Sequence, residues 1–191
     1  MARPVIHNDS LRQELLAVTA ELVDRDGPAK VTLRDVASAA GTSTTAVYSL
    51  FGGKSQLLTA VVNEGFRSFR DSQVAAAADG LEGLGLAYRG WALQHPALYR
   101  LMFGGALAAY VDCRPSPEIA AGAMDPLIDT VASAQAAGTL LPAPAQMVAV
   151  AIWGQVHGLV SLELAQVGPP EADWAAAYGA ALDAVVRGWA A

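Results

Sequence analysis

The sequence predicts an all-α protein in which three N-terminal helices precede a larger helical domain. Apolar residues make up 53% of the 191 residues, and most of them are Ala, Leu and Val. Gly and Pro gather between stretches whose apolar residues recur at helical spacing, and no stretch shows a clear strand pattern. Together these observations favour a helical protein.

The first helix is expected from about Ser10 to the break at Gly27-Pro28. Apolar residues recur at helical spacing between Leu11 and Val23, directly after a run of capping residues. The Gly-Pro pair then ends the pattern.

Two short helices follow, and the signals at their ends predict a helix-turn-helix. Thr32, with Asp35 three residues later, forms a variant of the capping box and starts a helix that ends near Gly41. Ser43 caps the next helix, which runs to about Leu50. The tight turn between them is typical of the motif.

Breakers divide the rest of the chain into further helices. They are expected from Lys54 or Ser55 to the alanines before Asp79, over 81–95, from Pro96 to Gly104-Gly105, over 117–137 with a kink or split at Pro126, over 144–167 and over 171–190. Residues 106–116 give no clear pattern. The expected domains are residues 1–54 and residues 55–191.

Charge is shared unevenly between the two parts of the chain. The net charge is −6, with eight Lys and Arg against seven Asp and Glu in residues 1–70, and four against eleven in residues 71–191. Only the N-terminal third is therefore suited to face a phosphate backbone.

The chain has the features of a cytoplasmic protein. Cys113 is the only cysteine, which excludes an intrachain disulfide and fits a reducing compartment, and no role is expected for it. Residues 1–9 lack an apolar secretion segment. The most apolar stretch, residues 147–164, is interrupted by polar residues and is interpreted as a buried helix rather than a membrane span.

The second short helix has the composition of a DNA-reading helix. Val47 and Phe51 can point into the domain, which leaves Thr44, Thr45 and Tyr48 on other faces. Lys54 begins the next helix, where its ammonium and free backbone N–H groups can converge on a phosphate. The alternative is a helical hairpin in which the Thr run caps a helix and Lys54 is solvated.

The stretch VTLRDVASAAGTSTTAVYSLFGGKSQLLTAVV, residues 31–62, resembles the DNA-binding domain of the TetR family of transcriptional regulators. The resemblance implies that Thr32 touches phosphate, that Ser43, Thr44 and Thr45 lie at the groove end of the recognition helix, and that Tyr48 and Lys54 clamp the backbone. This recognition helix has no Arg or Lys, so it offers no bidentate guanine contact, and Arg34 is the nearest substitute.

The C-terminal part resembles a TetR subgroup marked by a Trp-His-Gly signature. Here that signature is spread over Trp153, His157 and Gly158 in the stretch AIWGQVHGLVSLEL, and HPALYRLMFG at residues 95–104 matches a second element of the subgroup.

Small residues on the last two helices predict a dimer interface. Gly154 and Gly158 share a helix face that lets another helix approach closely, and the last helix supplies small partners such as Ala177 and Ala181. A four-helix bundle across a twofold axis would bury them, as the resemblance also implies. The alternative is a monomer that packs these helices on its own core.

Large adaptable side chains in the C-terminal region predict a pocket for a small apolar ligand. The candidates are Tyr88, Trp91, Tyr99, Met102, Phe103, Met124, Trp153 and His157. Most aromatic residues at helical spacing are plain core, and His157 has two open interpretations, as a ligand contact or as a buried histidine bonded to another side chain.

Metal and catalytic functions find no support in the sequence. The three histidines and one cysteine lack ligand spacing, and no phosphate loop or nucleophile elbow is present, so no metal, cofactor or enzyme activity is expected. The expected function is that of a ligand-responsive transcriptional repressor, a homodimer that binds palindromic operator DNA and is released by a small apolar inducer. The alternative is a helical carrier of small apolar molecules without specific DNA binding.

Overall fold

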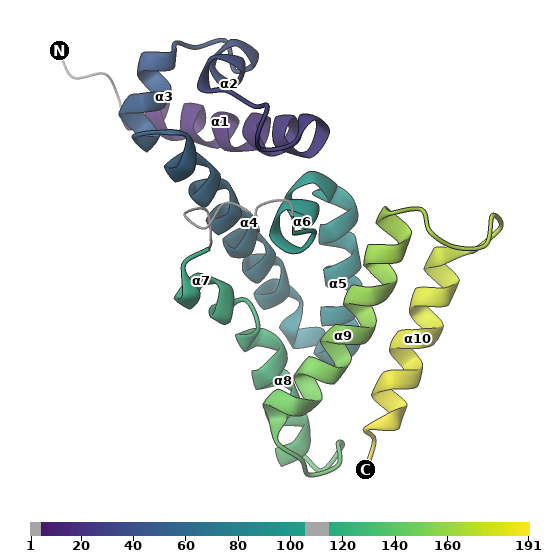
Figure 1. The fold of residues 1–191 in the computed structure, drawn as a ribbon. Coiled ribbons are helices and arrows are strands. Elements are labelled where there is room, and N and C mark those ends of the chain that lie inside the picture. Colours follow the sequence, from purple (N-terminus) through teal and green to yellow (C-terminus); the bar gives the residue numbers. More distant parts are fainter. Residues whose placement is uncertain (1–4, 106–114) are drawn as a thin grey trace. The chain divides into compact units, whose positions relative to one another are not determined.

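The regular structure is helical, as predicted. The computed structural model describes residues 5–105 and 115–191, and Figure 1 shows their helices. Apart from helices these ranges hold only one isolated β-bridge, between Leu140 and Ala190. The chain forms two compact units, which we call the N-terminal unit (residues 1–67 and 95–120) and the C-terminal unit (residues 68–94 and 121–191). Helix α4 (Lys54–Ala76) contributes residues to both. The division by function, between residues 54 and 55, stays a prediction.

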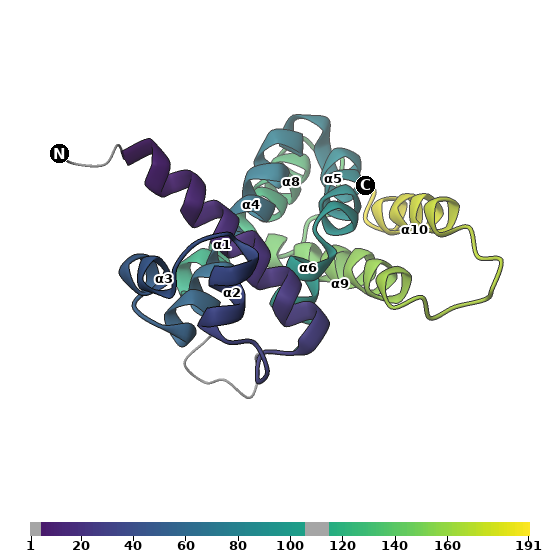
Figure 2. The same cartoon turned by 90° about the horizontal axis from the view of Figure 1, so that it is seen from above.

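The N-terminal unit is built around α1 (Val5–Asp26). Helices α2 (Leu33–Ala39) and α3 (Thr44–Phe51) lie close to it, as Figure 2 shows, and α6 (Pro96–Phe103) packs on it as well. The core of the unit is apolar and comes from all these helices and the first turns of α4, with Leu15, Val23, Val36, Val47 and Leu57 fully buried. Burial of these side chains is the main force that holds the short helices α2, α3 and α6 in the unit.

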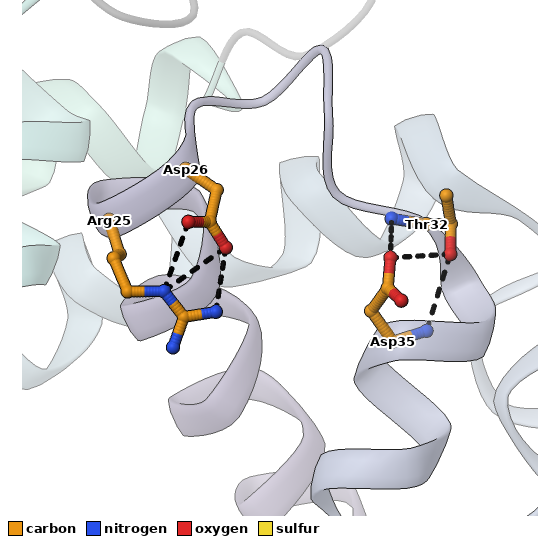
Figure 3. A network of polar contacts seen from close by, with 4 residues as sticks. All are labelled: Arg25, Asp26, Thr32 and Asp35. Atoms are coloured by element: carbon orange, nitrogen blue, oxygen red, sulfur yellow. Dashed lines mark hydrogen bonds and ion pairs between the residues drawn. The ribbon is translucent and has the colours of Figure 1, made fainter.

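The predicted caps of the short helices are confirmed. The Thr32 hydroxyl accepts the Asp35 N–H at 3.2 Å, and the Asp35 carboxylate accepts the Thr32 N–H at 2.9 Å, which completes the capping box (Figure 3). Ser43 caps α3, and Gly52 ends it in the left-handed region at φ +83°. The expected start of the first helix near Ser10 is wrong, because α1 begins at Val5 and runs through the polar residues taken as caps.

The C-terminal unit contains the end of α4 and four long helices that come later in the chain. A short 3₁₀ turn (Ala77–Asp79) leads to α5 (Gly80–Gln94), followed later by α8 (Asp125–Ala136), α9 (Ala145–Leu164) and α10 (Trp174–Gly188). Helices α9 and α10 run side by side (Figure 1). The core here includes Leu81, Val131, Val148 and Ile152.

The expected break near Pro126 is confirmed. Helix α7 (Pro117–Gly122) ends two residues before α8, and Pro126 occupies the first turn of α8, where its missing N–H costs nothing. Cys113 and most of the unclear stretch 106–116 lie outside the described residues.

Helix α9 is buried on one face only. Val148, Ile152, Val156 and Val160 point into the unit, whereas Val150 is 55% exposed. It is also the one described helix that is long and apolar enough to cross a membrane by length and composition, a test that core helices of soluble proteins also pass. Within one chain, the expectation of a buried helix therefore holds only for the face that packs into the unit.

Candidate nucleic-acid interface and ligand pocket

The turn between α2 and α3 is held by backbone conformation and by burial of both helices. Gly41 takes φ +60°, a region in which side-chain-bearing residues are strained, and nothing crowds the position. Val47 is completely buried and Phe51 nearly so, as the sequence predicts, and the Arg12 guanidinium lies over the Phe51 ring at 5.1 Å from its centroid. The outward face of α3 is fixed by these inward contacts.

That outward face carries hydroxyl groups and no charge. Tyr48 is 57% exposed, Thr45 is exposed and Thr44 is half-buried. The Ser43 hydroxyl accepts the Ala46 N–H at 3.2 Å, so its oxygen already serves the cap. Thr45, Tyr48 and Ser49 are thus the exposed hydroxyl residues of α3, and a DNA contact by Ser43, Thr44, Thr45 or Tyr48 stays a prediction.

Helix α3 has no Lys or Arg, and the basic residues of this region lie on other segments. Lys54 is the first residue of α4, and its ammonium donates to the Ala29 carbonyl across a long 3.4 Å. Arg34 is exposed on α2. Among the described residues, no carboxylate lies within 4 Å of the cationic groups of the following four side chains, Arg12, Lys30, Arg34 and Lys54. These Lys and Arg side chains can bind a phosphate without first breaking an ion pair.

Thr32 is already engaged by its own helix. Its hydroxyl donates to Asp35 Oδ2 at 2.6 Å and accepts from the Asp35 N–H, so both functions of the group are in use (Figure 3). The hydrogen bonds from Thr32 lower the pKa of Asp35, and the Arg25 guanidinium lowers the pKa of Asp26. The start of α2 is therefore lined by ionised carboxylates, and a phosphate contact by Thr32 stays a prediction.

The C-terminal unit encloses an apolar hollow. From α4 and α5 its walls take Phe69, Gln73, Leu81, Leu84, Gly85 and Tyr88. From the α7–α8 junction and α9 they take Ala123, Met124, Leu127, Ile152, Trp153 and Val156. The empty cavity measures only about 20 Å³. Three predicted ligand residues, Tyr88, Met124 and Trp153, thus line one small site.

Side chains from three helices hold α5 in place behind this hollow. The Gln73 amide, with its nitrogen toward α5, donates to the Leu84 carbonyl and accepts the Tyr88 N–H, each at 3.2 Å. The Tyr178 hydroxyl donates to the Gly85 carbonyl at 2.6 Å. On the next turn, Arg89 donates to Glu163 through two bonds of 2.8 and 2.6 Å, a fork that raises the pKa of Arg89.

We call these side chains, Gln73, Tyr178, Arg89 and Glu163, the polar frame. None of them was predicted from the sequence. The available signal was Gln73 itself, a polar residue four positions after Phe69 on the apolar face of α4.

His157 bonds to another helix. Its Nδ1 lies 2.9 Å from the Tyr88 hydroxyl, and its ring packs 5.3 Å from that of Trp153. Burial lowers the pKa of His157 below 6.5, so the ring is neutral at pH 7. The bond to Tyr88 agrees with the interpretation of His157 as a histidine bonded to another side chain, and Glu163, on the same helix as His157, pairs with Arg89.

The other predicted ligand residues lie elsewhere. Trp91 is buried beside Phe69 and donates from its ring N–H to the Ser68 hydroxyl at 3.0 Å. Tyr99, Met102 and Phe103 belong to α6 in the N-terminal unit, where Phe103 meets Tyr99 at 5.0 Å between ring centroids. They do not line the hollow, and a ligand role for them stays a prediction.

The small residues of α9 and α10 do not bring these two helices together. A Cβ added at Gly154 or Gly158 would meet nothing within 4 Å, so the close approach argued for these glycines is not made inside one chain. Ala177 is exposed and Ala181 half-buried. Among the residues described, the glycines in tight contact with α10 are Gly85, whose missing side chain leaves room for Leu182, and Gly168, which lies against Trp174.

No group of three or more metal-ligating side chains occurs in the described parts of the chain. A capped helix-turn-helix beside unpaired cations, together with a helical unit that encloses an apolar site, defines the class of helix-turn-helix DNA-binding regulators.

Comparison with known families shows which family of that class the chain belongs to. Residues 15–61 match the family model of bacterial regulatory proteins of the tetR family, and residues 81–185 match the tetracyclin repressor-like C-terminal domain. The chain belongs to the TetR family of transcriptional regulators, which bind DNA, act as dimers with small-molecule ligands and are typically not enzymes. The Trp-His-Gly subgroup stays a prediction. A search of the curated proteins found no match.

Solved structures agree with this assignment. The regulatory protein SCO4313 is 30% identical, with a TM-score of 0.79 over 96% of this chain and 98% of that one. A protein of unknown function from Rhodococcus sp. RHA1 is 29% identical, with a TM-score of 0.78 over 95% and 96%. A TetR family regulator from Marinobacter aquaeolei VT8 shares the fold at 22% identity, with a TM-score of 0.76 over 96% and 97%.

Proposed function

We propose that this TetR-family regulator is a repressor that binds a palindromic operator as a homodimer and leaves it when a small apolar inducer binds. In this proposal residues 1–54 bind DNA, and residues 55–191 bind the inducer and dimerise. The single observation that carries the proposal is the exposed hydroxyl face of α3, held by a buried inner face and followed at once by Lys54.

DNA contacts divide into reading and clamping. Thr44 and Thr45 would reach base edges, because a threonine offers a methyl group to thymine and a hydroxyl to a hydrogen-bonding edge. Tyr48 and Lys54 would contact phosphates, which fixes the register of α3 in the groove. Arg34 is exposed on α2 and forms no ion pair within 4 Å with a described carboxylate, so it is the candidate for a further base or phosphate contact.

Dimerisation would use the outer faces of α9 and α10. Val150 and Leu162 stay exposed on α9, and the positions of Gly154 and Gly158 are open, so a second copy can approach without displacing this chain's own side chains. A twofold dimer would present its two recognition helices about 34 to 36 Å apart, one turn of B-DNA. Such a protein would act in the cytoplasm, where its operator lies.

Inducer release requires that the ligand prefer one protein conformation. The ligand can change operator affinity only by the difference between its affinities for the DNA-binding and the released conformations, typically about 1 to 3 kcal/mol. Tyr88, Trp153 and Met124 on the hollow's walls are the residues we expect to sense it. Nothing in the fold or the comparisons favours the carrier interpretation.

Operator binding by purified protein tests the proposal. The preferred site is first selected from random duplexes, and binding is then measured by fluorescence anisotropy at several salt concentrations. Lys54→Ala should weaken binding to all duplexes and lower the slope of log K against log salt by about one unit. Arg187→Ala, which removes an exposed cation of α10, is the matched control and should leave both unchanged. Selection of no preferred sequence would refute the proposal.

A further inference from the structure

The hollow of the C-terminal unit contains no charge to meet a charged ligand. None of its lining residues is Asp, Glu, Lys or Arg. Of its two polar side chains, Gln73 is only 5% exposed and bonds to the backbone of α5, and Tyr88 lies 2.9 Å from His157. The nearby cation of α5, Arg89, is bound by both oxygens of Glu163. A carboxylate or ammonium group placed here would lose its water without gaining a counter-charge.

The hollow is too small in this conformation for any organic ligand. Its 20 Å³ is close to the roughly 10 to 15 Å³ that a single water molecule requires. A ligand must therefore move part of the wall.

Met124 is the part of the wall best able to move. It stands in the two-residue break between α7 and α8, and its unbranched side chain can change rotamer at little cost. The α5 wall, by contrast, is held by Gln73 from α4 and by Tyr178 from α10.

An open groove lies on the other side of the same short segment. Asp125 and Pro126 line this groove of about 640 Å³, whereas the neighbouring Ala123, Met124 and Leu127 line the hollow. One turn of chain thus separates the large groove from the small hollow. Arg70 of α4 also lines the groove and donates to the Gly122 carbonyl at 3.1 Å, where it ties α4 to the end of α7.

The groove itself disfavours anions. Its charged residues are Asp125, Asp129 and Arg70, two carboxylates against one guanidinium. An anionic ligand would be repelled on the way in and left unpaired inside.

We infer that the hollow binds an uncharged, largely apolar ligand, such as a long-chain alcohol, ketone or ester, which enters from the groove by displacing Met124. This inference rests on the proposed function, because it names the chemical class of the proposed inducer. A single polar group on the ligand would face the Tyr88 hydroxyl.

Three ligands of equal chain length test the ligand class. Decan-1-ol, decanoate and decylammonium are titrated at pH 7.5, below their micelle concentrations, and the fluorescence of Trp153 is followed against a Trp153→Phe background control. Decan-1-ol should bind at least about tenfold more tightly than either ion. Binding of either ion within threefold of the alcohol would overturn the inference, as would the lack of a saturable signal with decan-1-ol.

Association kinetics test the route. Met124→Ala should raise the association rate of decan-1-ol several-fold, and Arg70→Met, which removes the bond to Gly122, should raise it in the same direction. Leu86→Ala truncates an exposed residue of α5 outside the hollow and should change nothing. Rates within twofold of the wild type in both variants would refute the route. Operator binding without ligand is measured in parallel, so that a failure of the proposed DNA-binding function is distinguished from a failure of this inference.

Discussion

Gly158→Leu should separate the dimer while leaving the subunit folded. In the single chain nothing lies within 4 Å of a Cβ at this position, so a side chain can be attached there without a clash at its Cβ. Replacing a glycine inside a helix also stabilises that helix by about 0.5 to 1 kcal/mol. The free energy of unfolding of the subunit should therefore stay equal or rise slightly.

Across a twofold interface the same substitution acts twice. Overpacking of a close contact typically costs about 1 to 3 kcal/mol, and each dimer contains two copies of the position, so the dimer should lose about 2 to 6 kcal/mol. That loss raises the dimer dissociation constant by about 30-fold to about 2 × 10⁴-fold. Operator binding should weaken with it, since each half-site would then be engaged singly.

Sedimentation velocity over a range of protein concentrations measures this effect, with thermal unfolding followed by circular dichroism. Gly90→Leu is the matched control, because Gly90 lies inside α5 and its Cβ position is equally open. A Gly158→Leu protein that sediments as a dimer with an unchanged dissociation constant would refute the interface. If Gly90→Leu also separated the dimer, the effect would not belong to α9.

Three further predictions concern the remaining site residues. Tyr48→Phe should weaken binding to every duplex while keeping the preferred sequence, and a changed preference in site selection would show that Tyr48 reads bases. Thr44→Ala or Thr45→Ala should relax one or two operator positions at roughly 1 to 3 kcal/mol each, and recovery of the wild-type site by both would place the readout elsewhere. Trp153→Ala should reduce release by decan-1-ol but keep ligand-free operator binding, and loss of binding without ligand would mark Trp153 as core.

Stability should also respond to His157. Because burial lowers its folded-state pKa below 6.5, the unfolded chain takes up the proton first. The free energy of unfolding should therefore fall as pH drops through about 6.5 and level off below the folded-state pKa, as denaturant titrations would measure. His157→Gln should show a shallower dependence over this window, and an equally steep one would assign the effect to other groups.

Local signals predicted the N-terminal unit well because its structure is set by neighbours in sequence. The capping box of Thr32 and Asp35 and the turn at Gly41 involve residues within a few positions of each other, and each was recognisable from spacing alone. The start of α1 was misjudged because Asn8, Asp9 and Ser10 are compatible with a helix interior as well as with a cap.

The candidate ligand pocket depends on pairings of side chains that spacing along the sequence does not encode. Tyr88 and His157 are 69 residues apart, and Arg89 and Glu163 are 74 apart. The sequence also did not show which of the large apolar residues contact one another, because α6 packs in a different unit from α5. The sequence could supply candidates of suitable chemistry, and only the folded chain could group them.

The polar frame behind α5 has a consequence for how the pocket can change. Removing Gln73 or Tyr178 would lose buried hydrogen bonds to the backbone of α5, at about 0.5 to 1.5 kcal/mol each, whereas changing Met124 or Leu127 alters only apolar contacts at a helix break. Gln73 both supports α5 and lines the hollow, whereas Met124 and Leu127 line it without a hydrogen bond to α5. A biosensor for a new compound could be evolved from libraries confined to the α7–α8 junction, with the helix that supports the site left untouched.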